Sequence, residues 1–348
     1  MKEKVLLGMS GGVDSSAAAT VLIEQGYEVI GATMKMLPCE NDLAIQDAKK
    51  VCEVLGIKHY VFDCRQEFKR YVIDNFVETY QKAKTPNPCI ECNRYLKFGF
   101  FYEKAKELGC KYISTGHYAK IEYSEKYGKI VLRKSQADKK DQTYFLYNIP
   151  KEVLEKMLFP LKDFKDKDEI RKLAEKYHLP VAKKKDSQEI CFIPNDNYAD
   201  YLINCGNLKP KPGNIVTREG KVLGKHKGLI YYTIGQRKGL GISHPTPLYV
   251  LALDIKKNEV IVGGEDELYT KELMAIDLNY LLVDTLEEKM EVLAKVRYRA
   301  KEAKATIYPL EDKVKVVFEE PQRAVTQGQS VVFYTEDGVV IGGGKIAE

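Results

Sequence analysis

The chain has 348 residues, and its 55 Lys and Arg against 50 Asp and Glu give a formal net charge of +5. This length predicts two or three domains of about 100–200 residues each. A hydrophobic fraction of 44% and a charged fraction of 30% are typical of globular proteins and exclude wholesale disorder. The longest apolar runs are far below the ~18 residues of a membrane helix, and the N-terminus lacks a signal-peptide pattern. We therefore expect a cytoplasmic, monomeric protein with no membrane partner.

Short apolar runs alternate with amphipathic stretches over the first half of the chain. We expect strands over residues 5–7, 27–33, 58–63 and 112–115, and helices over residues 15–25, 42–55, 66–84 and 94–108. Gly26 and Gly56 follow the first two helices, where a C-terminal cap is common. This alternation predicts an α/β fold with a parallel sheet, whose ligands bind beyond the carboxyl ends of the strands.

The pattern changes near residue 200. A turn-forming break at 209–213 (KPKPG) is followed by short β-rich runs separated by glycine. Beyond residue 273 nearly everything is strand-like, with runs at 290–298, 305–308, 313–318, 330–334 and 339–341, which predicts a small closed or sandwich-like β-module. We therefore expect a catalytic domain over 1–200, a small central domain over 201–268 and a C-terminal β-barrel-like domain over 269–348.

A glycine-rich loop, GMSGGVDSS at 8–16, joins the first expected strand to the first expected helix. Its adjacent glycines let the backbone approach an anion, while successive N–H groups and the helix N-terminus supply positive potential. Ser10 and Ser15 add hydroxyl groups, and Asp14 could hold Mg²⁺ on bound phosphates. The loop is not a Walker A, because no Gly-Lys-Ser/Thr follows the glycines. A plain glycine turn is the alternative, but strand, loop and helix in series favour phosphate binding.

The chain contains eight cysteines, but a protein of this size in a reducing compartment does not need disulfides. Cys89, Cys92 and Cys191 lie among Pro, Asn, Asp and Ser residues, which predicts polar loops and a chemical role. Three lysines at 183–185 precede Cys191 and would favour its thiolate or hold an RNA phosphate. A solvated charge cluster is the alternative for these lysines.

The loop at 8–16 resembles the pyrophosphate loop of the N-type ATP pyrophosphatases, an adenine nucleotide alpha hydrolase-like fold that splits ATP between the α and β phosphates. Further segments narrow the resemblance: TPNPCIECN at 85–93, STGHY at 114–118, DKKDQTYFL at 138–146, KKKDSQEICF at 183–192 and TIGQRKGLG at 233–241. Together, and in this order, they resemble the tRNA-specific 2-thiouridylase family over essentially the whole chain.

The resemblance implies ATP-dependent adenylylation of the C2 oxygen of the wobble uridine, followed by sulfur transfer that gives 2-thiouridine. It implies that Cys191 carries a persulfide, that Cys92 is the second catalytic cysteine, and that Asp14 acts with them. The implied ATP contacts are Gly8, Met9, Ser10, Gly11, Gly12, Val13, Asp14, Ser15, Met34 and Gly116. The implied tRNA contacts are Asn87, Pro88, Cys89, His117, Lys140, Asp141, Gln142 and Gln329. The partners would be tRNA and a sulfur-donor protein or inorganic sulfide.

Position 89 departs from the family pattern, in which Asp is common there. Cys89, Cys92 and Cys191 form a potential set of three thiolates, which could bind a [4Fe–4S] cluster with one position open for hydrosulfide. Zinc would ordinarily need a fourth protein ligand, and none is adjacent in sequence. The alternative is that Cys89 is an incidental thiol beside a persulfide pair.

Residues 295–301 alternate cations with apolar side chains. On a strand, Lys295, Arg297, Arg299 and Lys301 would share one face and follow an RNA backbone, so we expect Arg297 and Tyr298 to contact tRNA. A solvated strand face is the alternative. Two other functions remain open: a different ATP pyrophosphatase acting on a small metabolite, which would leave the cysteines without a role, and a non-catalytic RNA-binding protein, against which the intact loop argues.

Overall fold

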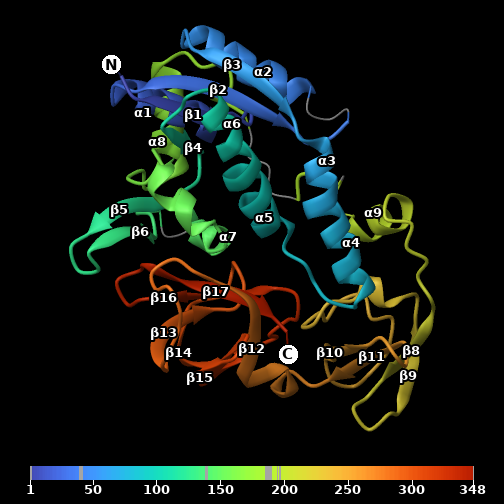
Figure 1. The fold of residues 1–348 in the computed structure, drawn as a ribbon. Coiled ribbons are helices and arrows are strands. Elements are labelled where there is room, and N and C mark those ends of the chain that lie inside the picture. Colours follow the sequence, from blue (N-terminus) through green and yellow to red (C-terminus); the bar gives the residue numbers. More distant parts are fainter. Residues whose placement is uncertain are drawn as a thin grey trace.

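The computed structural model describes residues 2–38, 42–137, 140–184, 190–193, 195 and 197–347, without the side chain of Asp42. Figure 1 shows an α/β domain above a closed barrel, with a smaller sheet domain beside the barrel. In the described part of the chain no helix is long and apolar enough to cross a membrane.

The α/β domain is built on a five-stranded parallel sheet of order β3-β2-β1-β4-β7. Its strands are β1 (Lys4–Gly8), β2 (Glu28–Lys35), β3 (Lys58–Asp63), β4 (Tyr112–Ser114) and β7 (Met157–Leu158). The first four strands confirm the expected ones. The strand order reverses at β1, because β2 and β3 follow on one side of it and β4 and β7 on the other. The loops after β1 and β4 therefore lie side by side, at the position where such sheets bind ligands.

Helices cover both faces of this sheet, and the alternation of side chains along β1 determines which residue faces which layer. Val5 and Leu7 pack with residues of α1 (Val13–Glu24), α2 (Asp42–Val54) and α8 (Lys167–Lys176). Leu6 faces the opposite layer and packs with Phe98, Phe101 and Ala105. All three β1 side chains are fully buried, as expected for a strand covered on both sides.

Two long helical runs extend from the sheet towards the other domains, and each contains a π-helical segment. The first consists of α3 (Arg65–Phe68), η1 (Lys69–Ile73) and α4 (Asp74–Gln81). The second consists of α5 (Pro88–Glu91), η2 (Cys92–Phe100) and α6 (Phe101–Glu107). The second run begins at Pro88, six residues before its predicted start, because proline fits the first position of a helix. Cys89 and Cys92 are therefore helical, and their expected placement in a polar loop is wrong.

The α/β domain also contains elements that the sequence did not indicate: a hairpin of β5 (Lys120–Ser124) and β6 (Lys129–Arg133), and the short helix α7 (Thr143–Leu146). The central domain follows α9 (Tyr198–Asn204) and is a four-stranded sheet of order β10-β11-β8-β9. Its strands are β8 (Gly213–Val216), β9 (Val222–His226), β10 (Tyr249–Asp254) and β11 (Glu259–Gly263).

The C-terminal domain is a closed six-stranded barrel of order β12-β15-β14-β13-β16-β17, which confirms the expected barrel-like module. Its strands are β12 (Tyr269–Tyr280), β13 (Met290–Lys295), β14 (Ala303–Leu310), β15 (Lys313–Arg323), β16 (Ser330–Tyr334) and β17 (Val340–Ile346). Closure leaves no exposed strand edge. The barrel shares one apolar core with the α/β domain, in which Val332, Tyr334 and Val340 pack with Tyr144 and Tyr147.

The predicted basic strand over 295–301 is wrong. β13 ends at Lys295, and the chain bends and turns from Val296 onwards. Val296 is buried, and the Arg297 guanidinium donates through Nη2 to the carbonyl oxygen of Arg323. The Tyr298 ring packs on Phe145 with a centroid distance of 4.4 Å. These contacts with distant segments outweigh the local alternation, so the four cations do not share a strand face.

Candidate active site

The loop after β1 is a backbone cradle. Gly11 adopts a φ of +67°, and a Cβ there would lie 2.4 Å from the Ala44 carbonyl oxygen, so glycine is required. Ser15 Oγ accepts from the Ser10 N–H at 3.2 Å and donates to the Gly12 carbonyl oxygen at 3.1 Å. Gly12 caps α1 without a side-chain hydrogen bond, so the amide groups of the first turn remain available to an anion. The geometry suits phosphate binding.

Asp14, in the first turn of α1, has both carboxylate oxygens engaged. Oδ1 accepts from the Tyr118 hydroxyl at 2.7 Å, and Oδ2 accepts from Lys167 Nζ at 2.6 Å. The Lys167 side chain is only 9% exposed, so this ion pair holds a nearly buried cation beside the loop. A Mg²⁺ ion bound through Asp14 would have to displace that ammonium, so the carboxylate does not fit the expected magnesium role in this conformation. The sequence did not reveal Lys167 or Tyr118, since both lie far from the loop along the chain.

The loops after β2 and β4 complete this edge of the sheet. A Cβ on Gly116 would lie 2.9 Å from the Ser15 backbone nitrogen, so only glycine lets the β4 loop approach the start of α1. Met34, near the carboxyl end of β2, is half-buried and packs against the cluster that contains Cys92. Both residues therefore border the phosphate loop or the cysteines.

Cys89, Cys92 and Cys191 come together beside this edge. Cys92 is buried, while Cys89 and Cys191 are exposed as residues. Protein atoms nevertheless surround the three thiols: desolvation raises the pKa of Cys191 to about 12 and that of Cys92 to about 11, and it raises the pKa of Cys89 as well. The neighbouring thiols contribute to the rise at Cys191 and Cys92, so the three sulfur atoms influence one another.

The positive charge of Lys97 acts on all three thiols. It lowers the pKa of Cys89, Cys92 and Cys191 and so offsets part of the rise that desolvation causes. Lys97 lies five residues after Cys92 within η2, and a π-helix places residues five apart on one face. The sequence predicts Cys92 in a loop before a helix over 94–108, which concealed this relation. The expectation that lysines 183–185 favour the Cys191 thiolate is not supported: Lys184 Nζ instead bonds the Gly11 carbonyl oxygen at 3.0 Å and Asp47 at 2.8 Å, and residues 185–189 lie outside the described part.

Two further side chains are linked to the cysteine region, His117 through Lys97 and Cys64 through Cys92. His117 packs between Phe98 and Phe159, each with a centroid distance of 6.0 Å, and desolvation and Lys97 hold its pKa well below the usual range, so the imidazole is neutral near pH 7. Its Nδ1 is 2.7 Å from the Thr115 hydroxyl. Cys64 packs with Cys92 in one cluster, but it is fully buried and its thiol donates to the Lys35 carbonyl oxygen.

The three cysteines do not form a metal site in this conformation. Among the residues that the structure describes, no three His, Cys, Asp or Glu side chains converge closely enough to hold a metal ion. The thiols are neighbours without the convergence that an iron–sulfur cluster requires. An iron–sulfur cluster on these three cysteines therefore stays a prediction.

The segment expected to contact tRNA at 140–142 is tied to the phosphate loop. Asp141 is buried, and its carboxylate accepts from the Ser135 N–H at 3.2 Å and the Thr143 hydroxyl at 2.5 Å, so its observed contacts are internal. Gln142 Oε1 accepts from the Tyr118 N–H at 2.9 Å, and Lys140 lies over the Tyr118 ring. Since the Tyr118 hydroxyl bonds Asp14, one tyrosine connects this segment to the loop.

The segment before the cysteines is anchored by the barrel. Gln329 Nε2 donates to the carbonyl oxygens of Thr85 at 3.1 Å and Pro86 at 3.0 Å, so its amide nitrogen holds this segment. Glu91, between Cys89 and Cys92, is 4% exposed and pairs with Lys345 of β17 at 2.8 Å. Lys345 also pairs with Asp277 of β12, and Asp277 with Arg94 of η2. No spacing in the sequence relates residue 91 to residue 345, so the sequence did not reveal this network.

An α/β domain with a phosphate cradle beside paired cysteines, joined to a barrel, defines a nucleotide-dependent enzyme of sulfur chemistry. Family models described as "tRNA methyl transferase HUP domain", "tRNA methyl transferase PRC-barrel domain" and "Aminomethyltransferase beta-barrel domain" match residues 3–195, 203–264 and 270–346.

Relatives match over the full length. A protein of Clostridioides difficile named tRNA-specific 2-thiouridylase MnmA is 48% identical to this chain, and the match covers 99% of this chain and 98% of the relative. Proteins of the same name are 50% identical to it in Acetivibrio thermocellus and 52% identical in Caldicellulosiruptor saccharolyticus. Each of these two matches covers 99% of both chains. The chain therefore belongs to the tRNA-specific 2-thiouridylase family. This confirms the resemblance, the expected fold and the expected enzyme class, a sulfurtransferase acting on tRNA.

Proposed function

We propose that this protein catalyses the ATP-dependent conversion of the wobble uridine of tRNA to 2-thiouridine. The observation that carries the proposal is that a phosphate-binding loop and a cluster of cysteines lie at the same edge of the sheet. The phosphate cradle follows β1, and the cysteine cluster packs against Met34 of β2 and includes Cys64, which follows β3. Full-length identity of about half to proteins named tRNA-specific 2-thiouridylase supports the same conclusion.

The first step activates the base. The C2 carbonyl of uracil is a poor electrophile and its oxygen a poor leaving group. The C2 oxygen attacks the α-phosphorus of ATP, the bond to the β-phosphate oxygen breaks, and pyrophosphate leaves. Residues 10–15 would hold the pyrophosphate through the loop N–H groups, with Lys167 providing nearby positive charge. Met34 and Gly116 would border the adenosine.

The second step transfers sulfur. The terminal sulfur of a Cys191 persulfide attacks C2, the C2–O bond breaks, and AMP leaves. The Cys92 thiolate then attacks Cys191 Sγ, and the electron pair of the broken S–S bond moves to the sulfur on C2. The products are 2-thiouridine and a Cys92–Cys191 disulfide. A persulfide donor and a thiol reductant regenerate the enzyme. Lys97, beside both cysteines, would favour the anionic sulfur forms.

The assignment of Cys191 is tested by Cys191→Ser. This variant should lose all thiolation of a tRNA transcript but still release one equivalent of pyrophosphate per enzyme in the presence of tRNA, because activation precedes sulfur transfer and AMP leaves only in the second step. Cys205→Ser is the matched control, since Cys205 is also an exposed free cysteine but caps α9; it should retain full activity. Thiolation by Cys191→Ser at the wild-type rate would contradict the assignment.

The cluster hypothesis makes a separate prediction at Cys89. If the three thiolates bind a [4Fe–4S] cluster, Cys89→Asp should abolish iron binding after anaerobic reconstitution and remove activity with sulfide, because a carboxylate is a poor ligand for a soft cluster. If Cys89 is incidental, the variant should stay active with a persulfide donor. A fully active Cys89→Asp enzyme containing no iron would exclude the cluster.

A further inference from the structure

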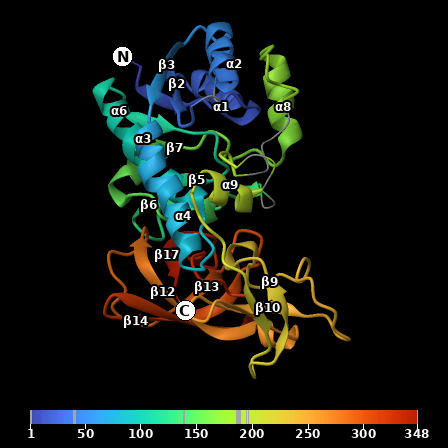
Figure 2. The same cartoon turned by 90° about the vertical axis from the view of Figure 1, so that its right-hand side faces the viewer.

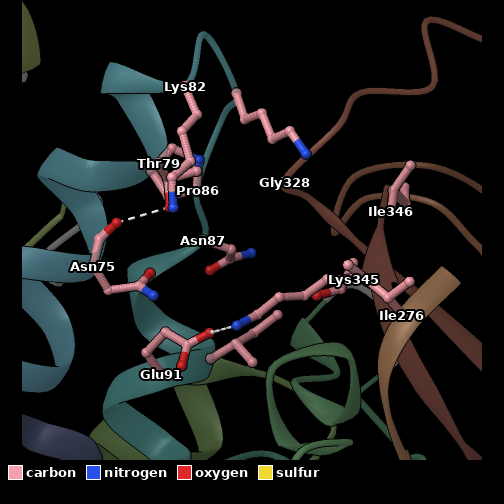
Figure 3. A pocket seen from close by; sticks show the side chains of 13 residues that line it. Asn75, Thr79, Lys82, Pro86, Asn87, Glu91, Ile276, Gly328, Lys345 and Ile346 are labelled. Atoms are coloured by element: carbon pink, nitrogen blue, oxygen red, sulfur yellow. Dashed lines mark hydrogen bonds and ion pairs between the residues drawn. The ribbon is translucent and has the colours of Figure 1, made fainter. Parts of the chain in front are cut away.

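A cavity of about 170 Å³ lies where the α/β domain meets the barrel, apart from the phosphate loop. Its walls come from α4, the segment 84–87, α5, β12 and β17. Figure 3 shows Asn75, Asn87 and Glu91 on the α/β side, opposite Ile276, Lys345 and Ile346 of the barrel. Because α5 carries Cys89, the cavity adjoins the segment that holds the cysteines.

Four polar side chains line the cavity without a hydrogen bond or ion pair to any described residue: Asn75, Lys82, Lys84 and Asn87. Asn87 is the most informative, because it occupies the N-cap position of α5, where an Asn side chain ordinarily accepts from the first turn, yet it makes no such bond. In Figure 3 its amide lies in the space between α4 and the barrel. These groups are available to a ligand.

The end of α4 presents the two lysines. Ala83 N donates to the Tyr80 carbonyl oxygen at 3.0 Å and Lys84 N to that of Thr79 at 3.1 Å, which is the Schellman pattern of helix termination. Ala83 takes the left-handed position, with a φ of 53°, where glycine is usual. The other charged lining residues, Glu91 and Lys345, neutralise each other at 2.8 Å. The lysines therefore leave the cavity positively charged.

The remaining lining is apolar and comes chiefly from Pro86, Ile90, Ile276 and Ile346. Cations, side-chain amides and apolar walls correspond to the three parts of a ribonucleotide: its phosphate, the edge of its base and the faces of its base. The volume of about 170 Å³ is below the roughly 300–1,000 Å³ of pockets for drug-sized ligands, so it suits a single base.

We propose that this cavity binds the base of the nucleotide next to the target uridine, with a neighbouring phosphate of the tRNA on Lys82 and Lys84. This inference rests on the proposed function, since it assumes that tRNA is the substrate. It adds a second base-binding position, formed jointly by the α/β domain and the barrel. Asn75 and Asn87 would read the edge of that base, and the barrel isoleucines would cover one of its faces.

The base contact is tested with tRNA transcripts that lack a single base beside the target uridine, on either side. For the wild-type protein, loss of the base at one of the two positions should raise the Kd about tenfold. For Asn75→Ala, the same loss should raise the Kd clearly less than tenfold, because one of the contacts to the base is already missing. Equal losses in the two proteins would overturn the proposal.

The phosphate contact is tested by salt dependence. Lys82→Gln/Lys84→Gln should reduce the slope of log K against log salt by about 0.7, because the two lysines share one phosphate and each single-strand phosphate contact contributes about 0.7. Lys49→Gln/Lys50→Gln is the control: both lysines are exposed on α2, at the opposite end of the domain from the barrel (Figure 1), and the change in net charge is identical. Equal slope changes in the two variants would show a general charge effect and overturn the assignment.

The arms of the experiment separate this inference from the function on which it rests. If the wild-type protein thiolates no intact transcript, the proposed function fails. If it thiolates the intact transcript but the effects of base loss and of Asn75→Ala on the Kd are additive, the cavity assignment alone fails. If the lysine variants bind tRNA normally and lose activity only with a protein persulfide donor, the cavity serves that donor, and the proposal is overturned.

Discussion

The phosphate loop and the cysteine segment border the same edge of the sheet but are held in different ways. Hydrogen bonds among residues 8–16 shape the loop, and Tyr118, Lys167 and Lys184 of the same domain add contacts to it. The cysteine segment depends on a separate domain, through Gln329 and Lys345 of the barrel. Figure 2 shows the long helical run of α3 and α4 extending from the α/β domain down to the barrel. The activation of uridine by ATP should therefore depend on contacts within the α/β domain, and sulfur transfer should depend on the interface between that domain and the barrel.

The largest effect should come from the loop. Asp14→Asn should reduce AMP formation by about 100-fold or more, because it removes the negative charge that positions Lys167 beside the phosphates. The Kd for tRNA should change less than twofold, and filter binding would measure this. Asp47→Asn, which breaks the more exposed pair with Lys184, should retain most activity. Undiminished AMP formation by Asp14→Asn would remove Asp14 from the activation step.

The interface should show an intermediate effect. Lys345→Met leaves the buried Glu91 carboxylate without its partner and should reduce the free energy of unfolding by about 2 kcal/mol. Thiolation should fall more than the first-turnover release of pyrophosphate, which reports activation, because the α5 segment loses its anchor. Lys151→Met, which breaks the exposed pair with Asp284, should leave the free energy of unfolding nearly unchanged, because solvent screens that pair. If both activities fall equally, the barrel does not act through the cysteine segment.

The same network predicts a dependence of stability on pH. Burial alone would raise the pKa of Asp277, but Lys345 and Arg94 outweigh burial and hold it below the usual value. A depressed carboxyl pKa contributes stability that is complete above the unfolded pKa of about 3.9 and is lost as the pH falls through the lower folded pKa. Asp277→Asn should therefore flatten the acid limb of the stability curve. An unchanged acid limb, measured by urea unfolding between about pH 2 and 5, would contradict this.

The smallest effect concerns the turn after β13. Arg299 is exposed, whereas Arg297 is engaged with the Arg323 carbonyl oxygen. Arg299→Gln should lower the salt slope of tRNA binding by about 0.9 or less, and Arg297→Gln should act mainly on stability. Slopes that fall equally in both variants would restore Arg297 as a phosphate contact.

Much of this protein could be predicted from local pattern. The strand, glycine loop and helix at 4–24 are neighbours in sequence, so periodicity and two adjacent glycines were sufficient to predict a phosphate cradle. Cys89, Cys92 and Cys191 differed from the other cysteines in the polar residues that surround them in sequence. Where prediction failed, at residues 295–301 and at the start of α5, contacts with remote segments or a helix-starting proline outweighed the local pattern.

By itself, then, the sequence determined the fold class, the family and the location of the two reacting regions, because each depends on short-range spacing. Only the tertiary structure decided which side chains complete them. Lys167 reaches Asp14 across 153 positions, and the pairing of Glu91 with Lys345 joins α5 of the α/β domain to the last strand of the barrel. Lys97 shares the π-helical segment η2 with Cys92, and its charge acts on all three thiols. Such pairings follow from packing and from the cost of leaving charges buried without partners, which no local spacing records.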